Sequence, residues 1–572
     1  GLGAFYEIAI LPARSANTLG DQALVEAIVQ PRPWMVGFTC YVWNIERTLW
    51  IARELKRRLP DLRIVLGGPE ITPDNAWVLE TADYDFAVIG EGEQTFAQLL
   101  LGLLGDDMPP VAIAGLYVPP SGKASRYDAA RRPAFRTPLP DLNQLGSPYL
   151  AGILDAAEEE MLLLETTRGC VFKCKFCYYP KSYDKQYYLS KENILANLSH
   201  AVDRGAREVF LLDPTLNQRR DFPDLLRILV QGNPGRQFTY FGELRGEGVT
   251  EDTARLLRDA NFTEVEVGLQ SIDAEAQTRM DRKNNLKAFE RGVRALMAQG
   301  IAVKVDLIVG LPGDTADSVR RGMHYLKDNS LYSDVQIFNL SILPGTAFRQ
   351  EAGELGLKFQ PRPPYYVLQT PTLGREELYG LMREAQVLFD IEFDAPPPPV
   401  LDFEPEGLVC QVWRVDMDHG PRPQCPPPAR WAQAFTIWLK SSDFHGSCDQ
   451  AVACIRHVLD ASPFTTLHVV LDLCAATTAQ RCQNALRPEV IQTLAATCLE
   501  STSYLDRYYA MQPGRPNGAK RLIAVLPASL RARLDEDWLE QIGTIATIVW
   551  QRGRQDPVPE TEVAPDDYAW IS

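Results

Sequence analysis

Histidine is scarce in this chain: the 572 residues contain six, and none precedes His200. The eleven cysteines are few for the length and odd in number, which argues against the disulfide framework of a secreted protein. No segment approaches the roughly 20 consecutive apolar residues of a membrane-spanning helix, and the N-terminal residues lack the pattern of a signal peptide. Because the chain begins with Gly1 rather than Met, we expect a processed or trimmed end. These absences favour a cytoplasmic protein without a membrane span.

Basic residues are also outnumbered, with 58 Lys and Arg against 74 Asp and Glu, for a net charge of −16. No basic run resembles a surface that follows a phosphate backbone, so we expect no nucleic-acid partner. The composition is 45% hydrophobic and 23% charged, as in ordinary globular proteins, and the length suggests about three domains.

Residues 1–110 alternate between short apolar runs and helical patterns. The runs at 34–40, 62–70 and 84–93 each end in or near glycine, and helices are expected at 45–60 and 94–104. This alternation predicts a Rossmann-like, doubly wound parallel sheet, whose ligands bind at the carboxyl ends of the strands. Residues 5–11 are a candidate further strand. Residues 111–158 are interpreted as a linker that contains a small hairpin at 114–120.

The alternation becomes more regular over residues 159–393. Six βα units predict a partial (β/α)6 TIM-type barrel with its chemistry at the carboxyl ends of the strands. The expected strands are 161–167, 208–214, 238–244, 264–270, 303–310 and 335–343.

A proline-rich linker is predicted at 394–430, followed by a C-terminal α/β accessory domain at 431–572. Its expected strands are 434–441, 466–473, 521–527 and 544–551, and one helix is expected within 488–510. Seven cysteines between Cys410 and Cys498 are interpreted as buried thiols, with an auxiliary cluster as the alternative. A lid, a substrate-recognition element or an oligomerisation surface are the roles considered for this domain.

Three cysteines lie within eight residues, in the sequence RGCVFKCKFCYYP directly after the first barrel strand. A loop can wrap Cys170, Cys174 and Cys177 around one compact metal centre. Zinc normally takes four ligands, and no fourth Cys or His is near. A four-iron cluster is normally held by four thiolates, so three would leave one iron open to a reactant.

The spacing C-x3-C-x-Phe-C after the first strand of a partial barrel resembles the radical S-adenosylmethionine (SAM) superfamily. This resemblance implies a 4Fe-4S cluster that binds and cleaves SAM to a 5′-deoxyadenosyl radical, with an external electron donor such as flavodoxin or ferredoxin. It assigns Glu243 to the ribose or amine of SAM, and Gln270, Ser271 and Arg282 to the methionine carboxylate. Residues near the adenine would be Gly310, Pro312 and Gly313.

The preceding α/β domain resembles the cobalamin-binding domain of cobalamin-dependent radical SAM enzymes. The sequence has no D-x-H-x-x-G motif, so cobalt would have no His ligand from this domain. The alternative is a fold that keeps its shape and binds nothing. The resemblance places Tyr41, Trp43 and Asn44 near the corrin. Residues near the cobalamin tail would be Gly67, Gly68, Glu70, Gly90, Glu91 and Gly92.

The resemblance implies a methyltransferase in which methylcobalamin and a 5′-deoxyadenosyl radical methylate an unactivated carbon of a small metabolite. A natural-product or pigment intermediate is the expected substrate class. A cyclisation, ring contraction or rearrangement without methyl transfer is the alternative. Asp213 is interpreted either as a substrate or SAM contact or as part of an Asp-Pro turn. Two tyrosine pairs, Tyr178–Tyr179 and Tyr365–Tyr366, are candidates for the pocket.

Overall fold

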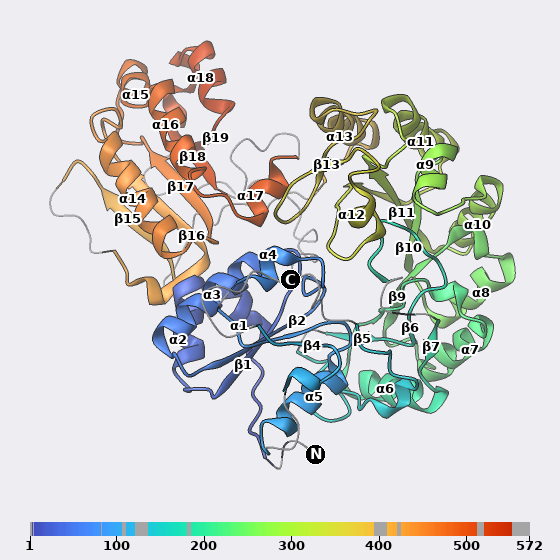
Figure 1. The fold of residues 1–572 in the computed structure, drawn as a ribbon. Coiled ribbons are helices and arrows are strands. Elements are labelled where there is room, and N and C mark those ends of the chain that lie inside the picture. The colour runs from blue at the N-terminus through green and yellow to red at the C-terminus, as the bar shows by residue number, and fades with distance from the viewer. Residues whose placement is uncertain are drawn as a thin grey trace. The chain divides into compact units, whose positions relative to one another are not determined.

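The computed structural model describes residues 3, 5–81, 83–105, 110–119, 135–158, 160–179, 183, 185–393, 409–419, 425–511 and 520–551 (Figure 1). Contacts group the chain into two units, Gly1–Leu66 with Thr81–Phe86 and Asp394–Ser572, and Gly67–Glu80 with Ala87–Phe393. The predicted domains at 1–110, 159–393 and 431–572 follow a different division and stay a prediction. Among the described helices, none has the length and apolar character needed to span a bilayer.

The first sheet has the strand order β1-β2-β3-β4. Its strands are β1 (Met35–Thr39), β2 (Arg63–Gly67), β3 (Phe86–Val88) and β4 (Leu116–Tyr117). The helices of this segment are α1 (Ala13–Thr18), α2 (Asp21–Val29), α3 (Ile45–Arg58), α4 (Ala76–Leu79) and α5 (Glu93–Gly102). These elements confirm the predicted Rossmann-like alternation of strands and helices.

Three details of this segment differ from the sequence predictions. Residues 5–11 form no strand, and Phe5, Ile8 and Ile10 are exposed. The predicted hairpin is instead the single short strand β4, which pairs antiparallel with β3. Strand β1 lies at the sheet edge and is only partly buried, because it has a neighbour on one side alone.

Six strands form the second sheet, in the order β12-β11-β10-β9-β8-β5. All five neighbouring pairs of this sheet are parallel, which confirms the partial (β/α)6 barrel. The strands are β5 (Met161–Leu164), β8 (Glu208–Leu211), β9 (Thr239–Leu244), β10 (Glu264–Gln270), β11 (Ala302–Val309) and β12 (Asp334–Asn339). Two small antiparallel pairs accompany them: β6 (Thr167–Arg168) with β7 (Tyr187–Tyr188), and β13 (Lys358–Phe359) with β14 (Val367–Gln369).

Helices of the barrel lie outside its strands (Figure 1). They are α6 (Lys191–Arg204), α7 (Phe222–Gly232), α8 (Glu251–Ala260), α9 (Ala274–Arg279), α10 (Leu286–Ala298), α11 (Ala316–Asn329), α12 (Ala347–Glu351) and α13 (Arg375–Phe389). Local signals fix their ends: Ser190 caps α6, where its side chain accepts a hydrogen bond from Asn193 N, and Gly205 ends it with φ +71°. Apolar side chains at Val265, Val267 and Leu269 are buried, whereas the alternate positions of β10 are less so.

The third sheet is parallel in sequential order, β15-β16-β17-β18-β19. Its strands are β15 (Cys410–Asp416), β16 (Trp431–Lys440), β17 (Thr466–Asp472), β18 (Arg521–Pro527) and β19 (Thr547–Gln551). Strand β15 was not predicted, because it falls within the expected linker. The helices are α14 (Cys448–Ala461), α15 (Ala479–Ala485), α16 (Pro488–Cys498), α17 (Tyr504–Tyr509) and α18 (Glu536–Gly543). The single helix expected within 488–510 is therefore wrong: two helices form, and Ser503 begins the second.

N-terminal helices pack against the C-terminal sheet within the first unit. The carboxylate of Asp21, which is fully buried, accepts hydrogen bonds from Arg47 and from the backbone N–H of Phe464. Gly20 N donates to Trp431 O at 2.8 Å, and a Cβ on Gly20 would lie 2.7 Å from that oxygen. A glycine is therefore required for close backbone approach at this position.

The substitution Gly20→Ala is predicted to lower the free energy of unfolding by about 1–3 kcal/mol, because its methyl group meets backbone oxygens that cannot move away easily. Chemical denaturation followed by tryptophan fluorescence measures this. Gly37→Ala is the matched control, since nothing lies within 4 Å of a Cβ there. Equal stability of the two variants would contradict the close contact.

Candidate functional site

A cavity of 180 Å³ lies beside the cysteine loop and the carboxyl-terminal halves of β9, β10 and β11. It brings together seven of the residues singled out from the sequence: Cys170, Cys174, Cys177, Tyr179, Glu243, Gln270 and Arg282. Its lining also includes Phe172, Phe176, Pro214, Thr215, Leu244, Arg245, Glu266, Gly268 and Asp306. The cavity lies where ligands of parallel barrels bind.

The cysteine loop is held by backbone hydrogen bonds to other loops. Lys175 N donates to Met280 O at 2.9 Å, and Phe348 N donates to Lys175 O at 3.1 Å. Cys170 and Cys174 are buried, and burial raises the pKa of the Cys177 thiol to about 11. Ligation by iron must therefore displace protons from these thiols.

The three sulfurs are more widely spread than the ligands of one ion. Among described residues, three potential ligand atoms lie within 4.8 Å of one another only at Asp416, Asp418 and His419, far along the chain. A multi-atom cluster fits the thiol positions better than a single zinc ion does.

Asp213 anchors the start of the cysteine loop. It is 1% exposed and accepts hydrogen bonds from Thr166 N at 2.7 Å, Thr166 Oγ1 at 2.5 Å and Thr167 N at 3.1 Å. Burial raises the pKa of its carboxyl to about 6, against an ordinary value of 3.8. It does not line the cavity, so neither sequence interpretation is complete: Asp213 fixes the backbone that leads to Cys170.

Arg168, two residues before Cys170, joins this loop to the glycine-rich turn that contains Gly90 and Gly92. It forms ion pairs with Glu91 and Glu93 at 3.0 Å each and with Glu165 at 2.7 Å. Glu91 also accepts a hydrogen bond from Leu139 N at 2.6 Å. The carboxylate predicted to lie near a cobalamin tail is therefore engaged with the cysteine loop.

Two arginines give the cavity a positive side next to Cys174, whose thiol pKa both of them lower against the larger effect of burial. Arg282 donates to Gly268 O through Nη2, while its buried Nε has no hydrogen-bond partner among the described residues. Arg245 stacks over Phe172 at 4.1 Å. Gln270 adopts φ +68°, and its buried Oε1 likewise accepts no hydrogen bond from the part of the chain that the structure describes. Unpaired polar atoms and a strained backbone at one cavity indicate a ligand that completes it.

Three carboxylates also line the cavity. Burial, with a smaller contribution from Glu266, raises the pKa of Glu243 to about 7. Glu266 and Asp306 lie against each other, and burial raises the pKa of both carboxyls. The cavity therefore brings basic and acidic side chains together.

Other residues predicted to bind SAM do not line the cavity. Ser271 is buried and its hydroxyl donates to Asp314 Oδ1 at 3.1 Å. Gly310 and Gly313 both have φ +96°, and a Cβ on Gly313 would lie 2.9 Å from Ala276 N. Pro312 belongs to the same turn. Their packing alone explains their residue types, and their contact with SAM stays a prediction.

Residues predicted near cobalamin are found on several turns. In the first unit, Tyr41 and Trp43 stack with centroids 4.5 Å apart, and Asn44 Oδ1 accepts from Tyr41 N. In the second, Gly68 and Gly90 have positive φ, while Gly67 and Gly92 do not. These assignments stay predictions.

Glu70 is 2% exposed and accepts a hydrogen bond from Tyr365 Oη at 2.7 Å. Tyr365 is fully buried there, so the suggested placement of Tyr365 and Tyr366 over the pocket is wrong; Tyr179, however, does line the cavity.

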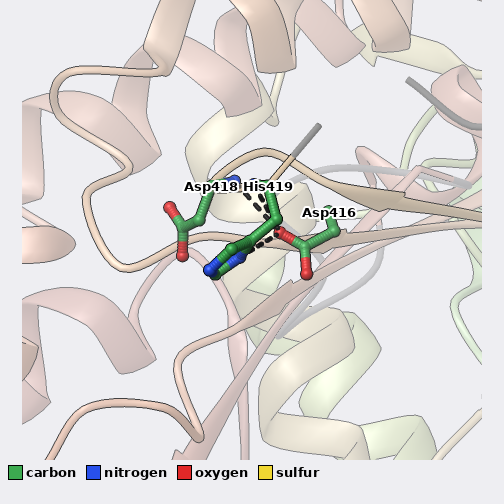
Figure 2. A group of neighbouring side chains, drawn as sticks. All are labelled: Asp416, Asp418 and His419. Carbon is green, nitrogen blue, oxygen red and sulfur yellow. Dashed lines mark hydrogen bonds and ion pairs between the residues drawn. The ribbon is translucent and has the colours of Figure 1, made fainter. Parts of the chain in front are cut away.

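Asp416, Asp418 and His419 lie close together beyond the end of β15 (Figure 2). Lys440 Nζ lies 3.0 Å from Asp416, and Asp418 accepts from Ser442 N and Ser441 Oγ. These carboxylates are satisfied by the protein itself, and we assign no site to them.

Arg245, Glu266 and Asp306 were missed by sequence reasoning. Each lies within or just after a correctly predicted strand, and period-two alternation identifies which residues share a face. The register between strands cannot be read from the sequence. That register decides which of these residues surround one cavity.

Comparison with known proteins agrees with this geometry. Residues 164–326 match the model of the radical SAM superfamily, and residues 3–100 match that of the B12 binding domain. The chain thus carries both regions that characterise cobalamin-dependent radical SAM enzymes. Its cofactors are accordingly a 4Fe-4S cluster, SAM and cobalamin.

Two curated relatives of this chain are methyltransferases. The cobalamin-dependent radical SAM methyltransferase TokK of Streptomyces tokunonensis is 27% identical over 60% of this chain and 52% of its own length. A 2-(S-pantetheinyl)-carbapenam-3-carboxylate methyltransferase of Streptantibioticus cattleyicolor is 25% identical over 64% of this chain and 58% of its own. The chain thus spans little more than half the length of these relatives.

A solved structure has a similar fold. TsrM from Kitasatospora setae, a radical SAM methyltransferase solved with cobalamin and a 4Fe-4S cluster bound, superposes with a TM-score of 0.51 at 19% identity. The match covers 62% of this chain and 75% of TsrM.

Cys174→Ala is predicted to abolish retention of the cluster, about four irons per chain, after anaerobic reconstitution with iron and sulfide. Two remaining thiolates cannot hold the cluster that three hold. Cys40→Ala is the control, since Cys40 is also buried but lies on the first sheet. Iron retained by Cys174→Ala and lost by Cys40→Ala would contradict the assignment.

Asp213→Asn is predicted to reduce the iron content as well, because an amide NH₂ in the place of Oδ2 cannot accept the hydrogen bond from Thr166 Oγ1. The pH dependence tests the same carboxyl. Its pKa is higher in the folded chain, so the stability that it contributes is present below about pH 4 and lost as the pH rises through 6.

Thermal unfolding between pH 4 and 6 should therefore depend less steeply on pH in metal-free Asp213→Asn than in the unsubstituted chain. Asp224→Asn, on the exposed side of α7, is the control. Identical pH profiles in all three proteins would show that Asp213 does not titrate in this way.

Proposed function

We propose that this protein is a C-methyltransferase that transfers a methyl group to an unactivated carbon of a small metabolite. The carrying observation is the cavity in which three cysteines face unpaired polar atoms of Gln270 and Arg282. Among the described residues that line it, there is no fourth Cys and no His, so an iron cluster bound there would keep one position open.

The residues present fit the cofactors of the family. Cys170, Cys174 and Cys177 would hold the cluster, and the guanidinium groups of Arg245 and Arg282 would bind a carboxylate beside it. When bound, the cluster would supply the electron that cleaves SAM and cobalamin would supply the methyl group. The role of the chain is to position SAM and substrate in the cavity and to limit the access of water.

The two methyltransferase relatives support methyl transfer as the reaction type. Their own substrates are not carried over to this chain. An external electron donor, such as a flavodoxin or ferredoxin, and a cytoplasmic location form part of the same proposal.

Anaerobic incubation of the reconstituted protein with SAM and a reductant tests this function. We expect both S-adenosylhomocysteine, from methyl transfer, and 5′-deoxyadenosine, from cleavage, with cobalt and iron both retained after desalting. Cys174→Ala should lose 5′-deoxyadenosine and keep S-adenosylhomocysteine formation, because only the cleavage needs the cluster.

Formation of 5′-deoxyadenosine without S-adenosylhomocysteine, with cobalamin retained, would contradict methyl transfer and favour a rearrangement. Failure to retain cobalamin would leave a radical SAM enzyme without a methyl carrier. Repeating the incubation without cobalamin is the control, and it should suppress S-adenosylhomocysteine alone.

A further inference from the structure

Strand register places acidic side chains together inside the barrel. Glu266 is paired with Glu243 on β9, and Gly268 is paired with Asp306 on β11. Directly paired residues of parallel strands, and residues two apart on one strand, point to the same face. The register therefore places one face of the sheet toward the cavity, and its lining includes Glu243, Glu266 and Asp306.

Asp306 has the least exposed side chain of these acids, and one of its carboxylate oxygens accepts no hydrogen bond from the described residues. Asp306 is 6% exposed, and the oxygen concerned is its buried Oδ1. Its neighbour Glu266 is also an acid, and its charge and a side-chain hydrogen bond add to burial in raising the pKa of Asp306. An unpaired, buried carboxylate oxygen on a residue that lines a cavity indicates a ligand that donates to it.

The one basic side chain found beside this pair, among the described residues, is shared with other acids. Lys304 Nζ lies 3.4 Å from Glu264 and 3.9 Å from Asp334. It also acts electrostatically on Glu266 and Asp306. One ammonium group among four carboxylates leaves the region with a deficit of positive charge, which a cationic ligand would supply.

Within β10, Glu266 lies deeper in the barrel than Gln270, which it precedes by four residues, or roughly 13 Å along a strand. Arg245 and Arg282 lie beside Cys174, where a carboxylate would bind. Glu243, the residue assigned to the ribose or amine of SAM, is the direct neighbour of Glu266 on β9. Competition with SAM therefore tests whether the acid pair holds a second ligand.

The same interior face carries a partly exposed apolar side chain on each edge strand of the barrel. Leu163 on β5 is paired with Phe210, and Phe338 on β12 is paired with Ile308 beside Asp306 on β11. Leu163 is 47% exposed and Phe338 is 46% exposed, although strand register directs both inward. A ligand with an apolar portion would cover these side chains.

We propose that Glu266 and Asp306 bind a protonated nitrogen of the methyl acceptor, which makes the substrate an amine or guanidine with an apolar body. This inference rests on the proposed methyltransferase function and names its substrate class. The carboxylates would accept charge-assisted hydrogen bonds from the nitrogen and would fix the distance of the acceptor carbon from the cluster.

Binding of n-hexylamine and hexan-1-ol to the reconstituted, SAM-loaded protein tests the proposal by anaerobic calorimetry. The two probes share an apolar chain and differ in charge at neutral pH. We expect the amine to bind at least about tenfold more tightly than the alcohol, as a charge-assisted contact predicts. Asp306→Asn and Glu266→Gln should each remove most of this preference while the affinity for SAM stays unchanged.

Glu264→Gln is the matched control, because Glu264 is on the same strand and face but does not line the cavity. It should keep the preference. The absorption spectrum of the cluster checks that each variant is folded. If Asp306→Asn does not fold, the result for Glu266→Gln alone tests the proposal.

Retention of the amine preference in both pocket variants would overturn the proposal. So would competition between hexylamine and SAM, or a tenfold loss of SAM affinity in the variants, since the acids would then belong to the SAM site. Formation of S-adenosylhomocysteine without an acceptor is measured separately. If the protein forms S-adenosylhomocysteine but shows no preference for the amine that depends on Glu266 and Asp306, the assignment of the acceptor fails while the proposed function stands.

Discussion

The parallel register of β9, β10 and β11 determines which side chains meet the cysteine loop. Each of these strands buries one face against helices and turns the other toward the cavity. A shift of one residue in any of them would turn its cavity-facing side chains toward the helices. The charged groups of the site, with arginines beside Cys174 and carboxylates on the paired strands, are brought together by this pairing and not by any local sequence motif.

The cysteine loop depends on support from outside the cavity. Asp213 holds the backbone at Thr166 and Thr167, and Arg168 links the same segment to Glu91. These contacts are buried, where a hydrogen-bonded carboxylate is stable and an unpaired one is costly. A loop that must present three thiols to one cluster is thereby held before any metal binds, which lowers the entropic cost of assembling the site.

Glycines in tight packing differ in meaning from a strained non-glycine residue at the cavity. Gly20 and Gly313 are required by close approach of neighbouring protein atoms, and they explain packing. Gln270 is different, because a non-glycine residue holds φ +68° with its side-chain oxygen unpaired at the cavity. Strain combined with an unsatisfied polar atom points to ligand binding, whereas a tightly packed glycine does not.

The sequence alone indicated the family, predicted the cysteine ligands and located the six barrel strands, because spacing and alternation are local properties that survive without a partner segment. Tertiary structure decided the rest. Asp306 and Glu266 became neighbours only through strand pairing, Tyr365 turned to Glu70 instead of the cavity, and β4 joined β3 instead of forming a hairpin. Each outcome depends on which distant backbone or side chain satisfies a buried polar group, and that choice is made by packing.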